Sequence, residues 1–79
     1  MCAFDGTRLE IVGYAEEIFH LRADDLGIKR KGRTDDGGEL VHFAAPGLST
    51  HIELYFPPSE TTEMDRLLTA LHHAGASDL

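Results

Sequence analysis

The sequence contains a single cysteine and lacks any apolar run long enough to cross a bilayer. Cys2 cannot form a disulfide within the chain, which suits a reducing compartment. No apolar run approaches the length of about 20 residues that a membrane-spanning helix needs. The first ten residues, MCAFDGTRLE, also lack the basic stretch followed by an apolar one that marks a secretory leader. These absences predict a cytoplasmic protein that is neither exported nor membrane-spanning.

The short motifs that carry catalysis are absent as well. The sequence has no glycine-rich phosphate loop with its lysine, no nucleophile elbow, no paired metal-binding cysteines and no HExxH pattern. Asp35 and Asp36 are adjacent carboxylates in TDDGG, but side chains on such a turn point in different directions and are typical of solvated turns. We therefore expect neither catalytic activity nor a cofactor.

Basic residues are scarce, because 7 lysines and arginines stand against 14 aspartates and glutamates, for a formal net charge of -7. With 79 residues and 42% apolar content, we expect one small globular domain over residues 1–79, at a size where a partner or a second copy often adds stability. The negative charge repels phosphate backbones and attracts basic surfaces. The expected partner is a larger protein with a basic surface, and neither a nucleic acid nor a membrane. The alternative is that the charge only keeps the protein in solution.

Four of the basic residues lie in one run, LGIKRKGRTDDGG, which raises the question of nucleic-acid binding. The four are Lys29, Arg30, Lys31 and Arg33. The run has no interleaved aromatic residue, and pairs of aspartates on either side cancel much of its field. Because TDDGG is a turn signal, we expect residues 27–33 to form a strand of a three-stranded meander, with basic side chains that discourage edge-to-edge aggregation. Salt bridges to an acidic patch on a partner or a second subunit are an alternative role.

The clearest element is a helix near the C-terminus, in PPSETTEMDRLLTALHHAG. Ser59 is the expected N-cap, and Gly75 fits the left-handed position after the last turn. Apolar residues recur at helical spacing and form one stripe: Met64, Leu67, Leu68, Leu71 and Ala74. The pattern predicts a helix over residues 60–74.

The stretch ELVHFAAPGLSTHIELYF predicts a β-hairpin that turns at Pro46 and Gly47. A loop symmetric about this turn would place Val41 opposite Ile52 and His42 opposite His51, with Glu53 on the same outer face. Two histidines and a carboxylate can bind a metal ion, so His42, His51 and Glu53 are an alternative metal-binding or small-ligand site. A solvated polar face of an antiparallel sheet is the simpler interpretation, because spacing places no third histidine or cysteine there.

Residues 8–26 fit two structures. Thr7 and Glu10 match a capping box, and apolar residues fall on one helical face opposite Glu10, Glu17, His20 and Asp24. This favours a first helix that ends at Gly27 and gives an α-β-β-β-α order around a three-stranded antiparallel sheet. Against it, Gly13 weakens a helix interior, Arg22 would enter the apolar face, and Phe19, Leu21 and Ala23 alternate as in a strand. The alternative is an extra hairpin, which would give a four- or five-stranded antiparallel sheet with one C-terminal helix.

The α-β-β-β-α order resembles in outline the double-stranded-RNA-binding domain. That family has a basic start to its final helix, whereas this chain has SETTEMD, so we do not expect RNA binding. In size, acidity and lack of catalytic motifs, the chain is similar to small phage-encoded inhibitors, including anti-CRISPR proteins, some of which block the nucleic-acid path of their target with negative charge. The resemblance implies an inhibitor that occupies a basic groove.

The expected contacts of such an inhibitor are carboxylates on two helices. They are Glu10, Glu17 and Asp24 on the first helix and Glu60, Glu63 and Asp65 at the start of the second. A homo-oligomeric structural subunit, such as a homodimer, is a further alternative.

Overall fold

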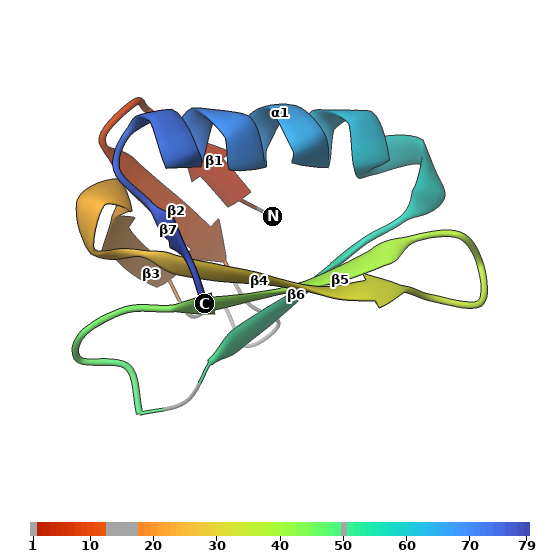
Figure 1. Cartoon of the computed structure of the whole chain (residues 1–79), viewed down its shortest axis with the longest axis horizontal. Coiled ribbons are helices and arrows are strands. Elements are labelled where there is room, and N and C mark those ends of the chain that lie inside the picture. The colour runs from red at the N-terminus through yellow and green to blue at the C-terminus, as the bar shows by residue number, and fades with distance from the viewer. Residues whose placement is uncertain (1, 13–17, 50) are drawn as a thin grey trace.

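Seven strands and one α-helix form an α+β fold in residues 2–12, 18–49 and 51–79, the parts of the chain that the computed structural model describes (Figure 1). The strands are β1 (Cys2–Phe4), β2 (Arg8–Val12), β3 (Ile18–Arg22), β4 (Gly27–Arg33), β5 (Glu39–Ala44), β6 (Ile52–Phe56) and β7 (Ser77–Asp78). The helix α1 (Thr61–His73) follows β6, and two short 3-10 helices occupy Ala23–Asp25 and Pro58–Glu60. No helix in the described ranges is long and apolar enough to cross a membrane.

The strands form two sheets. A three-stranded antiparallel sheet has the order β1-β2-β3, and a four-stranded sheet has the order β6-β5-β4-β7. The last strand, β7, is parallel to β4 and pairs only with Gly27 and Ile28. Buried residues from both sheets and from α1 form a single hydrophobic core, and α1 lies along one side of the sheets (Figure 1).

The expected N-terminal helix is wrong. Leu9, Ile11 and Leu21 are buried and alternate with exposed Arg8, Glu10 and Arg22, so this segment has the two-residue period of strands. No capping box forms at Thr7 and Glu10; instead Asp5 Oδ1 accepts hydrogen bonds from the main-chain N–H groups of Thr7 (2.9 Å) and Arg8 (2.8 Å).

The alternative of an extra hairpin is right about β2 and β3 but wrong about their sheet. They pair with β1 rather than with the meander, and the parallel β7 means that the larger sheet is not purely antiparallel. Without a first helix, the outline of the double-stranded-RNA-binding domain is also wrong.

The meander β4-β5-β6 is confirmed, and its first turn is the expected TDDGG. The carboxylate of Asp36 accepts hydrogen bonds from the hydroxyls of Thr34 and Tyr55 and from the N–H of Gly38 (2.9 Å). These donors, the Thr34 hydroxyl first, lower the pKa of Asp36 to about 2. Gly37 supplies the positive φ of 88° that the turn needs.

The expected register of the second hairpin is wrong by two residues. Val41 lies opposite Leu54, and His42 lies opposite Glu53 rather than His51. The loop is asymmetric, because a tight turn closes at its start, where Leu48 N–H donates to the carbonyl of Ala45 (3.1 Å), and the remaining residues lengthen the β6 side. A shift of two residues keeps every side chain on its predicted face.

Helix α1 begins and ends within one residue of its predicted bounds. The expected Ser59 cap does not form, because Ser59 lies in the 3-10 helix that leads into α1, and α1 has no side-chain cap. The C-terminal prediction is confirmed: Gly75 has a φ of 115°. Gly75 N–H donates to the His72 carbonyl (3.1 Å) and Ala76 N–H to the Leu71 carbonyl (3.0 Å), which is a Schellman motif.

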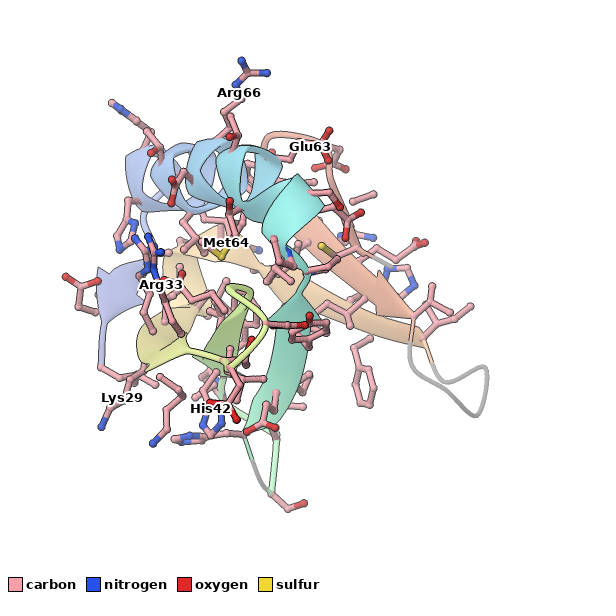
Figure 2. All side chains as sticks on the ribbon, turned by 90° about the vertical axis from the view of Figure 1, so that its right-hand side faces the viewer. Lys29, Arg33, His42, Glu63, Met64 and Arg66 are labelled. Atoms are coloured by element: carbon pink, nitrogen blue, oxygen red, sulfur yellow. The ribbon has the colours of Figure 1, made fainter. Side chains whose placement is uncertain are left out.

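The hydrophobic core draws on both sheets and the helix. Its fully buried side chains include Leu9 and Ile11 from β2, Val41 and Phe43 from β5, and Met64 and Leu71 from α1. Figure 2 shows Met64 directed toward the sheets, whereas Arg66 points away from them into solvent. This arrangement fixes the start of α1 against the outer strands β1 and β6, where the candidate site lies.

Candidate functional site

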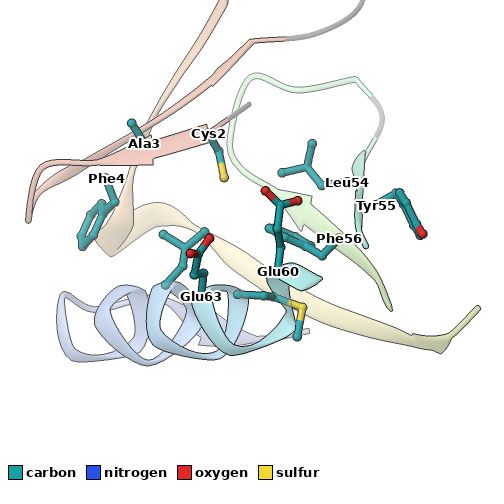
Figure 3. Close-up of a pocket in the computed structure, with 10 residues that line it drawn as sticks. Cys2, Ala3, Phe4, Leu54, Tyr55, Phe56, Glu60 and Glu63 are labelled. Carbon is teal, nitrogen blue, oxygen red and sulfur yellow. The ribbon is translucent and has the colours of Figure 1, made fainter. Parts of the chain in front are cut away.

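A groove of about 400 Å³ lies between β1, β6 and the first half of α1 (Figure 3). We call it the β1–β6 groove, and it is lined by Cys2, Ala3, Phe4, Leu54, Tyr55, Phe56, Glu60, Glu63, Met64 and Leu67. Its volume falls within the range of about 300 to 1,000 Å³ that is usual for binding sites. Each of the two strands that flank it is an edge strand of its own sheet.

Strand alternation makes the walls of the groove apolar. Cys2 and Phe4 lie opposite Ile11 and Leu9 in the register of the three-stranded sheet, so their side chains share the face of the core. Leu54 and Phe56 alternate with Tyr55 in the same way. Figure 3 shows the side chains of Leu54 and Phe56 on the groove side and that of Tyr55 pointing away. These wall residues are half-buried, so they keep surface that a ligand could cover.

Two carboxylates stand beside these apolar walls. Glu60 ends the 3-10 helix before α1, Glu63 lies in the first turn of α1, and both side chains are exposed. Neither carboxylate forms an ion pair or hydrogen bond with any residue that the structure describes. The groove therefore combines apolar walls with negative charge that the described chain leaves uncompensated.

The thiol of Cys2 belongs to the wall of the groove rather than to reactive chemistry. Burial, and to a smaller extent the negative charge of Glu60, raise the pKa of this thiol. A raised pKa keeps the sulfur protonated at neutral pH, whereas a nucleophile requires the thiolate. Cys2 thus behaves as a small apolar residue in this place.

The other predicted carboxylates do not join Glu60 and Glu63. Asp65 Oδ1 lies 3.4 Å from Arg30 Nη2, and Asp24 forms an ion pair with Arg22 at 3.0 Å. The carboxylate of Glu10, on β2, lies 3.8 Å from His20 Nδ1. Glu17 lies outside the described residues. The expected pair of acidic helical faces is therefore wrong, although a role for single carboxylates in partner binding stays a prediction.

The predicted cluster on the hairpin does come together, through a different register. His42 Nε2 lies 2.6 Å from Glu53 Oε2, and the rings of His42 and His51 meet edge to face with centroids 5.8 Å apart. Among the described residues, no group of three or more histidine, cysteine or acidic side chains could hold a metal ion. The use of His42, His51 and Glu53 for another small ligand stays a prediction.

The basic run lies on β4, as expected, and its central arginine is engaged within the chain. Arg30 donates to Glu39 Oε2 through Nε (2.9 Å) and Nη2 (2.7 Å) in addition to its contact with Asp65. Because β7 pairs only with the first two residues of β4, the following residues form an open sheet edge in the described structure. Figure 2 shows that Lys29 lies away from Glu63, so this part of the basic run is separate from the β1–β6 groove. The run thus has the position in which basic residues protect an edge.

Comparison with known proteins found no matching family model, no matching curated protein and no matching solved structure.

The sequence indicated Glu60 and Glu63 but missed the walls that make them a site. Leu54 and Phe56 were recognised as strand residues, whereas Cys2 and Phe4 were not, because β1 has only three residues and follows the start of the chain. The alternation of apolar residues from β1 through β2 was the available signal.

Proposed function

We propose that the chain is a non-enzymatic interaction protein that binds a basic surface of a larger protein through the β1–β6 groove. The observation that carries this proposal is that Glu60 and Glu63, unpaired among the described residues, stand beside the half-buried apolar walls of the groove. Basic surfaces commonly bind nucleic acids, so occupation of one would inhibit the partner, as in the anti-CRISPR type of inhibitor.

The chemistry of the groove suits a lysine or arginine side chain of the partner. Such a side chain has an aliphatic stem that packs on apolar surface and a cationic head that needs a carboxylate or water. Leu54 and Phe56 offer the first environment, and Glu60 and Glu63 offer the second. The net charge of -7 would accelerate association with a basic partner and make it depend on salt.

The same charges argue against nucleic acid as the ligand. Phosphate would meet Glu60 and Glu63 at the groove, and Arg30 is already engaged by Glu39 and Asp65. Lys29 and the basic residues after it extend along one strand without an interleaved aromatic side chain.

The test is an NMR titration of the ¹⁵N-labelled protein with an oligolysine peptide and, separately, with a short DNA duplex. We expect oligolysine to give saturable shifts in the amides around Glu60, Glu63 and β6, and we expect these shifts to weaken with added salt. The double variant Glu60→Gln, Glu63→Gln should lose them.

The matched control is Asp25→Asn with Asp35→Asn, which removes the same charge from exposed carboxylates that have no ion pair in the described structure. This variant should keep the groove shifts of the native protein. Equal losses in both double variants would mean that the peptide senses only net charge. Saturable binding of DNA at physiological salt, without a response to oligolysine, would contradict the proposal.

A further inference from the structure

The β1–β6 groove runs beside an unpaired sheet edge. β6 ends the order of the four-stranded sheet, and no described strand pairs with its outer side. The five residues Ile52–Phe56 contain no proline, lysine or arginine and no bulge. Prolines, basic side chains and bulges usually protect an exposed edge strand, because its free N–H and C=O groups can otherwise pair with another strand.

The open edge of β4, unlike that of β6, carries features that block the addition of another strand. The open part of β4 carries Lys29, Lys31 and Arg33, and its register shifts at a bulge between Arg30 and Gly32. These are recognised means of blocking strand addition. Since β6 lacks them and has an apolar groove beside it, its edge is suited to another strand.

We propose that a segment of the partner protein binds in extended conformation along β6 and adds a strand to the four-stranded sheet. This inference rests on the function proposed above and specifies how the basic partner is held. In strand addition, main-chain hydrogen bonds supply affinity and alternate side chains supply specificity.

The pattern of side chains in the added strand follows from the two faces of β6. Every second residue would point into the groove, where a lysine or arginine stem contacts Leu54 and Phe56 and its charge meets Glu60 and Glu63. The intervening residues would lie beside Tyr55, which is 46% exposed and offers an aromatic surface to apolar side chains. The expected segment therefore alternates basic and apolar residues.

A second copy of this chain is a poorer occupant of the same edge. Pairing β6 with its own copy would bring no cation to Glu60 and Glu63, because β6 contains no lysine or arginine. Each copy also carries a net charge of -7, so like charges would oppose this assembly. A cationic segment gains from the same carboxylates.

The test uses the capped hexapeptide Val-Lys-Val-Lys-Val-Lys and two N-methylated forms of it. One form is methylated on the valine amides and the other on the lysine amides, so each lacks the N–H donors along one side of the strand. Only one side of an added strand faces β6. We therefore expect one form to lose affinity by about tenfold or more, while the other binds nearly as the parent does. The parent peptide should also slow hydrogen exchange of β6 amides.

The outcomes separate this inference from the proposed function. If both methylated peptides bind as the parent does, and Glu60→Gln with Glu63→Gln still weakens them, strand addition is wrong and the acidic groove is right. If neither oligolysine nor the hexapeptide binds, the proposed function is also wrong. If light scattering gives a doubled mass and the free protein already protects its β6 amides, a second copy occupies the edge, which overturns the inference.

Discussion

Truncation of Leu71 tests whether α1 is an integral part of the core. Leu71 is fully buried, whereas Leu67, one turn earlier on the same helix, is half-buried at the groove. Leu71→Ala and Leu67→Ala remove the same atoms from the same helix. The difference between the two variants therefore reports burial rather than helix propensity.

The magnitude follows from the atoms removed. Leucine to alanine deletes three carbons, and their transfer to water costs about 2.4 kcal/mol when they are fully buried. The remaining cavity brings the expected loss at Leu71 to about 3 to 5 kcal/mol. At Leu67, where the side chain is partly in contact with water, the transfer cost is about halved, and we expect a loss of about 1 kcal/mol. A domain of this length has a total stability of roughly 4 to 12 kcal/mol, so Leu71→Ala should unfold much of a less stable protein.

Urea unfolding followed by circular dichroism measures both losses. The midpoint should fall much further for Leu71→Ala than for Leu67→Ala, with little change in the slope of the transition. Equal losses at the two positions would refute the assignment of burial along α1. A loss below about 1 kcal/mol at Leu71 would mean that the helix packs loosely on the sheets.

Three further predictions concern turns and ionisable groups. Gly75→Ala should cost about 2 kcal/mol in urea unfolding, and Gly47→Ala about 1, because both need positive φ but only a Cβ at Gly75 would meet Asp24 Cα, at 3.1 Å. The ring nitrogens of His72 donate hydrogen bonds to the carboxylate of Asp78 and to the main-chain carbonyl of Leu68, and these acceptors, Asp78 first, raise the pKa of His72. The protonated ring therefore stabilises the folded protein below about pH 6.5, and this contribution is lost as pH rises through the raised pKa. Asp78→Asn should therefore destabilise the protein more at pH 6 than at pH 9, and a constant difference would contradict the assignment. The pKa of Asp36, lowered to about 2, contributes stability above about pH 4 that is lost as pH falls toward 2. In Asp36→Asn, the free energy of unfolding should therefore fall less between about pH 4 and pH 2 than in the native protein.

The elements that could be predicted from the sequence are those set by local signals. The turn TDDGG, the turn at Pro46 and Gly47, and the left-handed Gly75 each depend on a few neighbouring residues, and all three lie where expected. The apolar stripe of α1 likewise repeats within one segment. Such signals do not require knowledge of the rest of the fold.

The largest errors arose where a helical and a strand period fitted the same residues, or where segments far apart in the sequence come into contact. Apolar positions in residues 8–26 satisfied a helical stripe as well as strand alternation, and only the pairing of β2 with β1 and β3 decides between them. The candidate site was only partly predictable for the second reason. Glu60 and Glu63 were recognisable as an acidic helix start, but the groove walls come from β1 and β6, which are far apart in the sequence.

The pairing of β4 with β7 has a consequence for the order of folding. β1 to β3 and β4 to β6 are each made of consecutive strands, so their contacts close short loops and can form quickly. Gly27 meets Ser77 only after the whole intervening chain, including α1, has been placed. We expect the two meanders to form early and β7 to join last. Until then, the whole outer edge of β4 would be open, and its lysines and arginines would guard the folding intermediate against aggregation as well as the finished protein.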